Sequence, residues 1–335
     1  MTTRRERVAV VALAAMVAIA ACSSGGTSST RSTEARSRRP APSAGCSGAP
    51  VAAGVTERTM TSGGIERRFQ LTVPQGYDGR KPFPVVMGLH ALSIPHGVVA
   101  GLTGFADMAA RYDFISVAPS GRLDGTIPYW LAAPTTDNED VRFIADLLDR
   151  LEAELCVDTA RVYSTGMSNG GQMSSLLACR IPDRITAVGP VAGVEFPTTC
   201  RGRAVPVIAF HGTADPIVTY EGGGLNATKI ADVQHWKGQV PPGLPQHHGV
   251  DAAMRTWAAH NGCDRRPVEQ RIAPEVRRQT WQHCEADTVL YVVDGGGHAW
   301  PGKPVPQFEA AFGHATTQID ASTLIFDFFF EHSRR

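Results

Sequence analysis

The sequence lacks an excess of charge of either sign, because its 335 residues include 32 Lys and Arg and 32 Asp and Glu. Without a basic field the chain has no general attraction for phosphate groups, so nucleic acid is not an expected partner. It also lacks a long apolar run: the stretch from Val8 to Ala21 is too short to span a bilayer comfortably. Hydrophobic residues still make up 43% of the chain, which excludes a disordered protein.

The N-terminal segment has the pattern of an export signal. Three arginines at positions 4, 5 and 7 precede the apolar run from Val8 to Ala21. The run ends Ala20-Ala21-Cys22, which resembles the lipobox of bacterial lipoproteins, where the cysteine is acylated. We therefore expect a signal peptide over residues 1–21, a lipid anchor on Cys22, and a mature protein that is attached to the membrane or secreted. The alternative is an ordinary signal peptide cleaved nearby, with Cys22 lost or idle.

Residues 22–45 are rich in Ser, Thr, Gly, Pro and Arg and show no apolar periodicity. Such a segment cannot bury enough surface to offset the entropy of ordering it. It is therefore predicted to be a disordered tether, followed by a single catalytic domain over residues 46–335, which we expect to be monomeric.

Six cysteines remain besides Cys22, an even number in a compartment where disulfides persist. None of these cysteines has C-x-x-C spacing, so no metal site is expected. The sequence alone does not determine the pairing. Proximity favours Cys179 with Cys200 and Cys263 with Cys284, which leaves Cys46 with Cys156 by elimination.

Short apolar runs alternate with helical patterns after the tether. Two extended segments, 56–60 and 65–73, flank Ser62-Gly63-Gly64 and predict a hairpin at an antiparallel edge. Buried parallel strands are predicted at 84–89, 114–118, 161–165, 187–191, 205–210 and 288–293. A helix is predicted over the apolar face from Val141 to Leu155, and a closing helix after Thr317. This alternation predicts an α/β fold with a doubly wound, mostly parallel sheet and helices on both faces.

Gly166-Met167-Ser168-Asn169-Gly170 follows the strand 161–165 and opens a predicted helix that runs to about Cys179. A G-x-S-x-G sequence between a strand and a helix is typical of the nucleophile elbow, in which a tight turn exposes the serine hydroxyl. Ser168 is therefore the candidate nucleophile. The oxyanion hole is expected to use the backbone N–H of Asn169 and that of Ala91, in the loop after the third strand.

A serine hydroxyl needs a base, and the base needs an acid to hold its tautomer. In this fold class the acid and the histidine follow the serine on loops after later strands. Asp215 follows the strand 205–210, and His298 lies in the glycine-rich loop after the strand 288–293. These two are the candidate acid and base, whereas Asp232 and Asp251 lie in or beyond the irregular stretch 222–249. His211 is expected to be structural, bonded to loop backbone.

Trp300 and Trp130 are the candidate substrate-binding residues, with Trp236 a weaker one. Large aromatic side chains suit the wall of a site that holds an acyl or aryl group. The stretch 222–249, rich in Gly, Pro and His, is predicted to be a surface excursion near the site.

Several motifs in order resemble the extracellular polyhydroxybutyrate depolymerases and feruloyl esterases of the α/β-hydrolase fold, over about Cys46 to the C-terminus. These motifs lie at 161–171, 177–179, 190–193, 211–215, 261–263 and 297–302. The resemblance implies Ser168 as nucleophile, Asp215 as acid and His298 as base, as the residues themselves indicate. The chain departs from the family where Leu89-His90-Ala91 replaces the usual Leu-His-Gly, and where 229–248 is expanded.

We therefore expect a serine esterase that cleaves a polyhydroxyalkanoate oligomer, a feruloyl ester or a short-chain acyl ester through an acyl-serine intermediate. No metal or organic cofactor is required by this chemistry. Three alternatives remain open: an acyltransferase of the same fold, a peptidase, and a catalytically inactive binding lipoprotein.

Overall fold

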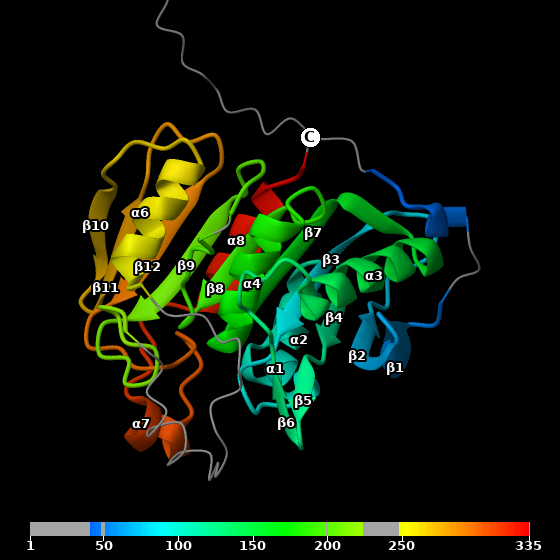
Figure 1. Cartoon of the computed structure of the whole chain (residues 1–335), viewed down its shortest axis with the longest axis horizontal. Coiled ribbons are helices and arrows are strands. Elements are labelled where there is room, and N and C mark those ends of the chain that lie inside the picture. The colour runs from blue at the N-terminus through cyan, green and yellow to red at the C-terminus, as the bar shows by residue number, and fades with distance from the viewer. Residues whose placement is uncertain (1–40, 48–50, 199, 224–247, 335) are drawn as a thin grey trace, which may run out of the picture. The chain divides into compact units, whose positions relative to one another are not determined.

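The computed structural model describes residues 41–47, 51–198, 200–223 and 248–334. A ten-stranded sheet forms the centre of the fold (Figure 1). Its strands are β1 Gly54–Ser62, β2 Ile65–Val73, β3 Phe83–Leu89, β4 Ile115–Pro119, β7 Val157–Met167, β8 Ala187–Val191, β9 Val207–Gly212, β10 Val268–Ala273, β11 Val276–Thr280 and β12 Thr288–Val293. The described residues all lie in one compact unit, Arg38–Arg335.

The strand order places the loops that follow β3 and β7 side by side. The order is β1-β2-β4-β3-β7-β8-β9-β12-β11-β10, with parallel pairing from β4 to β12 and antiparallel pairing at both edges. From β3 the chain builds the sheet towards β4, and from β7 it builds in the opposite direction. The carboxyl ends of β3 and β7 are therefore neighbours at a topological switch point, where ligands of such sheets bind. The predicted doubly wound, mostly parallel sheet is confirmed.

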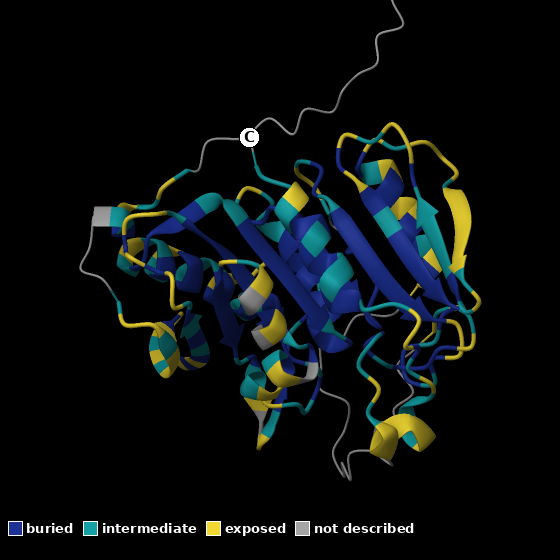
Figure 2. Cartoon of the chain, turned by 180° about the vertical axis from the view of Figure 1, so that it is seen from behind, coloured by how far each residue is buried: buried dark blue, intermediate teal, exposed yellow. Residues whose placement is uncertain are grey.

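Helices cover both faces of the sheet. The longer ones are α3 Glu139–Glu154, α4 Asn169–Arg180, α6 Val250–His260 and α8 Ala321–Glu331. Alternate strand residues such as Met87 and Val86 belong to two separate apolar clusters, as expected when successive side chains point to opposite faces. Helices α3, α4 and α6 contribute to the first cluster, and α8 contributes to the second together with α2, Phe105–Arg111. Figure 2 shows the central strands buried between these layers.

The N-terminus of α3 shows why this helix was predictable. The Asn138 side chain accepts hydrogen bonds from the N–H groups of Asp140 and Val141, which have no partner inside the helix. The apolar face from Val141 to Leu151 is buried against the sheet. Capping and periodicity therefore agree, and the helix forms where both indicate it.

The predicted hairpin is confirmed, with Ser62 opposite Ile65 across a two-residue loop. Gly63 and Gly64 have φ of 56° and 80°, the left-handed conformation that such a tight loop requires. Elements without a strong apolar run were not predicted: α1 His96–Leu102, α2, the small hairpin of β5 Arg122–Asp124 and β6 Ile127–Tyr129, α6, β10, β11 and α7 Pro306–Phe312. β10, for example, is exposed along nearly its whole length.

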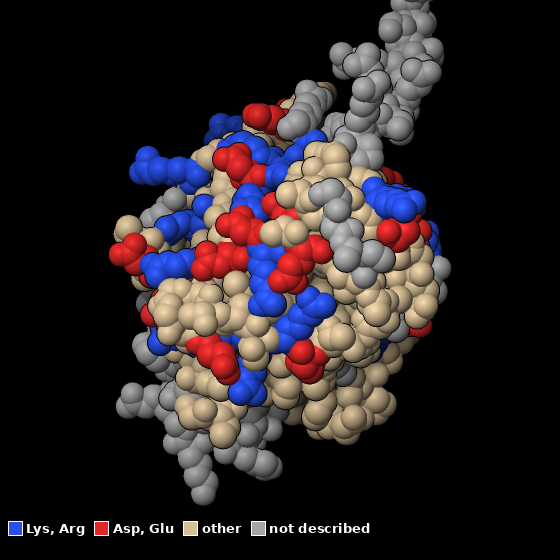
Figure 3. All heavy atoms as spheres, turned by 90° about the vertical axis from the view of Figure 1, so that its right-hand side faces the viewer, with Lys and Arg blue, Asp and Glu red and all other residues tan. Residues whose placement is uncertain are grey.

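Acidic and basic side chains alternate on the face shown in Figure 3, as the balanced composition suggests. Over the described residues, the ion pairs include partly exposed ones such as Arg184 with Asp149 at 2.6 Å and Arg58 with Glu154 at 2.9 Å. Such exposed pairs contribute little to stability. This face therefore presents no field of a single sign.

The first described residues differ from the predicted end of the tether. Residues 41–45 were expected to be disordered, yet the Ala41 N–H donates to Asp158 Oδ1 at 2.9 Å and the Ser43 N–H donates to the Val157 carbonyl at 2.9 Å. The nearby Cys46–Cys156 disulfide holds this segment beside β7. The predicted signal peptide, Cys22 and the tether up to residue 40 lie outside the described residues. In the part of the chain that the structure describes, no helix has the length and apolar character needed to cross a membrane.

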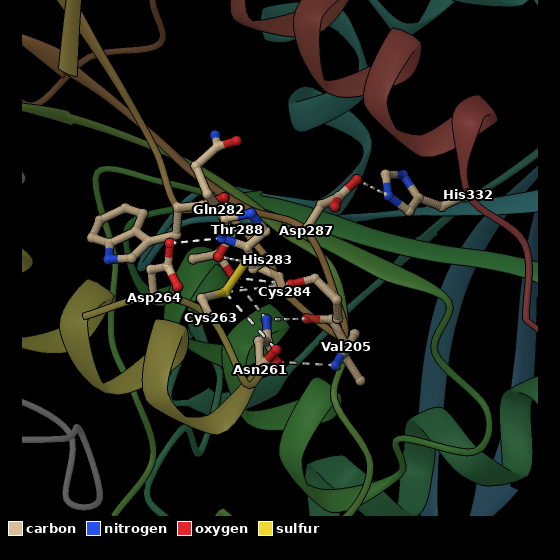
Figure 4. Close-up of a disulfide and its surroundings, with 12 residues drawn as sticks. Val205, Asn261, Cys263, Asp264, Gln282, His283, Cys284, Asp287, Thr288 and His332 are labelled. Atoms are coloured by element: carbon tan, nitrogen blue, oxygen red, sulfur yellow. Dashed lines mark hydrogen bonds and ion pairs between the residues drawn. A yellow bond between two sulfur atoms is a disulfide. The ribbon is translucent and has the colours of Figure 1, made fainter. Parts of the chain in front are cut away.

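The three disulfides are Cys46–Cys156, Cys179–Cys200 and Cys263–Cys284, so the favoured pairing is confirmed. Figure 4 shows the third, between the end of α6 and the segment that leads into β12. Beside it the Asn261 side chain donates to the carbonyl of Val205 at 2.9 Å and to Thr288 Oγ1 at 2.9 Å. The bond and the amide together hold α6 to the starts of β9 and β12. Disulfides of this number are typical of proteins from an oxidising compartment.

Removing the Cys46–Cys156 bond is expected to lower stability more than removing either of the other two. Its sequence separation is 110 residues, against 21 for each of the others. Loop-closure entropy corresponds to about 5 kcal/mol for a loop of that size and about 3 kcal/mol for the shorter loops. Urea unfolding of the Cys46→Ser/Cys156→Ser and Cys263→Ser/Cys284→Ser variants measures the difference. Equal losses in the two variants would contradict the expectation.

Candidate active site

Ser168 stands at the sharp turn between β7 and α4. Its φ of 56° and ψ of −122° are unusual for a residue other than glycine, and its N–H donates to the Val191 carbonyl at 2.8 Å. The turn is possible because the flanking residues are small: a Cβ on Gly166 would lie 2.6 Å from the Leu89 carbonyl oxygen, and one on Gly170 would lie 2.2 Å from it. The glycines of the motif thus allow β3 to approach closely, and the serine is the residue that the turn exposes.

Asp215 lies in the turn after β9, with its side chain fully buried. Oδ1 accepts from the N–H groups of Ile217 and Val218 at 2.8 and 2.9 Å, and Oδ2 accepts from His298 Nδ1 at 2.8 Å. Burial alone would raise the pKa of Asp215, but the His298 and His211 rings hold that pKa well below its usual range. Asp215 is therefore a carboxylate at neutral pH, bonded to the proton on Nδ1 of His298.

His298 lies in the loop after β12, and its N–H donates to the Phe312 carbonyl at 2.6 Å. Since Nδ1 donates to Asp215, the neutral ring has its acceptor at Nε2. His298 and Ser168 line the same cavity. The three residues predicted from chain order are thus brought to one edge of the sheet: Asp215 bonded to His298, and His298 facing a cavity that it shares with Ser168.

The loops that carry the acid and the base are tied to each other. The Ala214 N–H donates to the Gly296 carbonyl at 2.9 Å, and the Gly295 N–H donates to Thr213 Oγ1 at 2.8 Å. A Cβ on Gly212 would lie 2.2 Å from the Gly296 carbonyl oxygen, so the contact needs glycine. The parallel pairing of β9 with β12 therefore continues into the loops and fixes the distance between Asp215 and His298.

His211 has the structural role predicted for it. It is buried, its Nε2 donates to the Val218 carbonyl at 2.8 Å, and the same atom lies 3.3 Å from Asp215 Oδ2. The ring thus supports the turn that carries the acid. Asp251, the weaker candidate for the acid, instead accepts a hydrogen bond from the Tyr220 hydroxyl at 2.6 Å.

A cavity of about 340 Å³ opens beside Ser168 and His298. Most of its wall is apolar, and it comes from the β3–α1 loop, from Trp300, and from the segment 303–315 that contains α7. The apolar lining residues include Leu92, Ile94, Val99, Met167, Ile217, Trp300, Val305, Phe308 and Phe312. The part played by α7 was not predicted, although Phe308 and Phe312 are spaced one helical turn apart, which is the signal that could have found it.

Of the two predicted substrate-binding tryptophans, only Trp300 lines the cavity. Its indole N–H donates to Ser322 Oγ at 3.0 Å, which holds the ring at the wall. Trp130 does not line the cavity, contrary to the prediction: it is fully buried and its indole N–H donates to the His90 carbonyl at 3.0 Å. A buried indole needs an acceptor, and here the acceptor lies in the core. Trp236 and most of the stretch 222–249 lie outside the described residues.

The two predicted oxyanion donors are placed at neighbouring loops. Asn169 is the first residue of α4, so its N–H has no acceptor within the helix. Ala91 follows β3 and lines the cavity. Within the described ranges neither of these two N–H groups donates to another protein atom. Ala91 does not need a positive φ, so alanine adopts the loop conformation where the family usually has glycine.

The doubly wound sheet and the strand–turn–helix at Ser168 define an α/β-hydrolase. Solved structures support this fold: acetyl xylan esterase from Aspergillus awamori superposes with a TM-score of 0.56 at 15% identity, over 77% of this chain and 97% of that one. The family described as esterase PHB depolymerase matches residues 69–225, which include Ser168 and Asp215.

Two relatives extend this likeness. A protein described as "probable feruloyl esterase C" from Aspergillus flavus is 30% identical over 67% of this chain and 80% of its own length. Feruloyl esterase B from Piromyces equi is 27% identical over 70% of this chain, which spans 42% of that protein. The chain belongs to the polyhydroxybutyrate depolymerase and feruloyl esterase family, and it is a carboxylic ester hydrolase.

Proposed function

We propose that the protein is a serine esterase that acts through an acyl intermediate on Ser168. The observation that carries the proposal is the buried Asp215–His298 hydrogen bond of 2.8 Å beside a cavity that Ser168 also lines. A carboxylate bonded to Nδ1 holds the imidazole in the tautomer whose Nε2 can accept a proton. This is the condition under which a serine hydroxyl becomes a nucleophile.

The reaction follows from these positions. Ser168 Oγ bonds to the ester carbonyl carbon while its proton passes to His298 Nε2, and the N–H groups of Asn169 and Ala91 donate to the resulting oxyanion. The tetrahedral intermediate then loses the alcohol, which leaves with the proton from His298. Water repeats the sequence on the acyl-enzyme and releases the acid, so that Ser168 and His298 return to their starting states.

The apolar cavity favours an acyl group larger than acetyl. Burial of each methylene contributes about 0.8 kcal/mol, or roughly fourfold in an equilibrium constant, as long as the chain stays within the cavity. A wall that contains Trp300, Phe308 and Phe312 also suits an aromatic ring. Relatives named feruloyl esterases support a hydroxycinnamoyl or medium-chain acyl ester as the substrate.

A panel of esters tests this function. We expect labelling by a fluorophosphonate probe, and kcat/KM rising from p-nitrophenyl acetate to p-nitrophenyl hexanoate and p-nitrophenyl ferulate, because the larger acyl groups fill the cavity while the leaving group stays the same. A protein that the probe does not label would be a binding lipoprotein rather than an enzyme of this mechanism. A flat response across the panel would show that the cavity does not hold the acyl group, and transfer to an added alcohol in preference to water would indicate an acyltransferase.

The proposal includes a lipid anchor at Cys22. It is supported by the arginines and apolar run before Ala20-Ala21-Cys22 and by the disulfides, which are typical of exported proteins. In bacteria that process lipoproteins, the wild type is expected to incorporate an alkyne-labelled fatty acid and the Cys22→Ser variant is not. Ser24→Ala, a substitution in the predicted tether that leaves Cys22 and all six other cysteines in place, serves as the control that keeps the label. Equal labelling of wild type and Cys22→Ser would contradict the anchor.

A further inference from the structure

The sheet by itself does not position both oxyanion donors. The ladder between β3 and β7 ends at the pair Leu89 and Gly166, before Ala91 on one side and Asn169 on the other. Beyond that pair the ladder supplies no hydrogen bond between the two loops, although they stay close: a Cβ on Gly170 would lie 2.6 Å from the His90 carbonyl oxygen. Other contacts must therefore set the position of Ala91.

A buried network of hydrogen bonds joins the two loops through the end of β6. The Asn169 side chain binds the backbone of Trp130 at both polar groups: Oδ1 accepts from the Trp130 N–H at 2.7 Å, and Nδ2 donates to the Trp130 carbonyl at 3.1 Å. The Trp130 indole N–H then donates to the His90 carbonyl at 3.0 Å. All three side chains are buried, with Asn169 only 3% exposed.

His90 completes the connection to Ala91. The Gly121 N–H donates to His90 Nε2 at 2.9 Å, so the proton of the neutral ring lies on Nδ1, which donates to the Ala91 carbonyl at 2.9 Å. Burial lowers the pKa of His90 to about 4, so the ring stays neutral at working pH. Its ring also lies 4.9 Å from the Trp130 ring, centroid to centroid. The side chain of Asn169, whose backbone N–H is one proposed oxyanion donor, is thus linked through Trp130 and His90 to Ala91, whose N–H is the other.

We infer that Asn169, Trp130 and His90 are positioning residues that keep the Ala91 N–H in register with the Asn169 N–H. The inference rests on the serine-esterase mechanism proposed above. Oxyanion donors act on the transition state and not on the bound ester, and a misplacement of about 1 Å can cost as much as 100-fold in rate. Disturbing the network should therefore lower kcat and leave KM nearly constant.

The test compares substitutions of two buried tryptophans, of which Trp130 belongs to the network and Trp257 does not. Trp130→Phe removes the bond to the His90 carbonyl and keeps most of the packing. Trp257→Phe is the matched control, because Trp257 is also fully buried and its indole N–H donates to a backbone carbonyl, that of Glu195, at 2.8 Å, but it lines no part of the cavity. Asn169→Ala removes the other end of the network. Rates on p-nitrophenyl butyrate are divided by the active sites titrated with a fluorophosphonate, so that unfolded protein does not count.

For Trp130→Phe and Asn169→Ala we expect kcat per titrated site to fall about tenfold or more with KM within about twofold of the wild type. The inhibition constant of an alkyl boronic acid, which forms a tetrahedral adduct with the serine, should rise by the same factor. Trp257→Phe should keep its kcat per titrated site. Wild-type kcat in the first two variants, or an equal loss in Trp257→Phe, would overturn the positioning role alone. A wild-type protein that the fluorophosphonate does not label would overturn the proposed function as well.

Discussion

Replacing Ser168 with alanine should abolish the hydrolysis of p-nitrophenyl butyrate, with kcat falling by about 10⁴-fold or more. The variant removes the only atom of this side chain that can bond to the carbonyl carbon. It leaves the elbow intact, because the turn depends on Gly166 and Gly170 rather than on the hydroxyl. The melting temperature should therefore stay close to that of the wild type.

Ser164→Ala is the matched control for this experiment. Ser164 lies on β7, four residues before Ser168; it is fully buried, its Oγ lies 2.9 Å from Ser174 Oγ, and it does not line the cavity. Its loss removes a hydroxyl and a hydrogen bond from the core but no group from the proposed reaction, so activity per folded molecule should be retained. If Ser168→Ala and the wild type hydrolysed the ester at similar rates, the nucleophile would have to be another residue.

Replacing Asp215 with asparagine should lower kcat by about 10⁴-fold, with little change in KM. The amide can accept the proton of the Nδ1 of His298 only weakly, and it can instead donate to Nδ1, which would place the imidazole proton on Nε2. In that tautomer the ring cannot take the proton from Ser168. The negative charge that stabilises the imidazolium during the reaction is lost as well.

Asp251→Asn provides the comparison. Asp251 is a carboxylate that accepts one side-chain hydrogen bond, from the Tyr220 hydroxyl, and it does not line the cavity. Steady-state rates of Asp215→Asn and Asp251→Asn are measured at neutral pH. We expect a large loss of kcat only in Asp215→Asn, because Asp251 takes no part in the proposed reaction. Comparable losses in both, or activity retained in Asp215→Asn, would rule out the assigned role of Asp215.

The strands illustrate which parts of the fold could be predicted. β2, β8 and β12 have the bounds expected from their apolar or alternating residues, since each is a run ended by turn residues. β10 and α7 carry few buried side chains and form only because neighbouring segments pair with them or support them. Local preference is too weak in such elements to show in the sequence.

The residues of the site also fall into those that the sequence predicted and those that it did not. Chain order after an elbow motif was enough to select Asp215 and His298, because successive parallel strands end at the same edge of the sheet. The wall of the cavity was not selected, because α7 is a helix of seven residues and the spacing of Phe308 and Phe312 by one helical turn is its only sign in the sequence. Trp130 was misjudged because its position in the sequence says nothing about the direction of its ring.

The sequence by itself determined the alternation of strand and helix, the elbow at Ser168 and the order of the acid and the base after it, because each depends on residues close together or on a regular pattern. It favoured the three cysteine pairs without determining them, since the partners of a disulfide such as Cys46–Cys156 are distant in the chain. Only the tertiary structure decided that Trp300 faces the cavity while Trp130 joins Asn169 to His90. The reason is that a side chain's surroundings are set by segments distant in the chain, and the partner that a buried N–H finds is known only when those segments have packed.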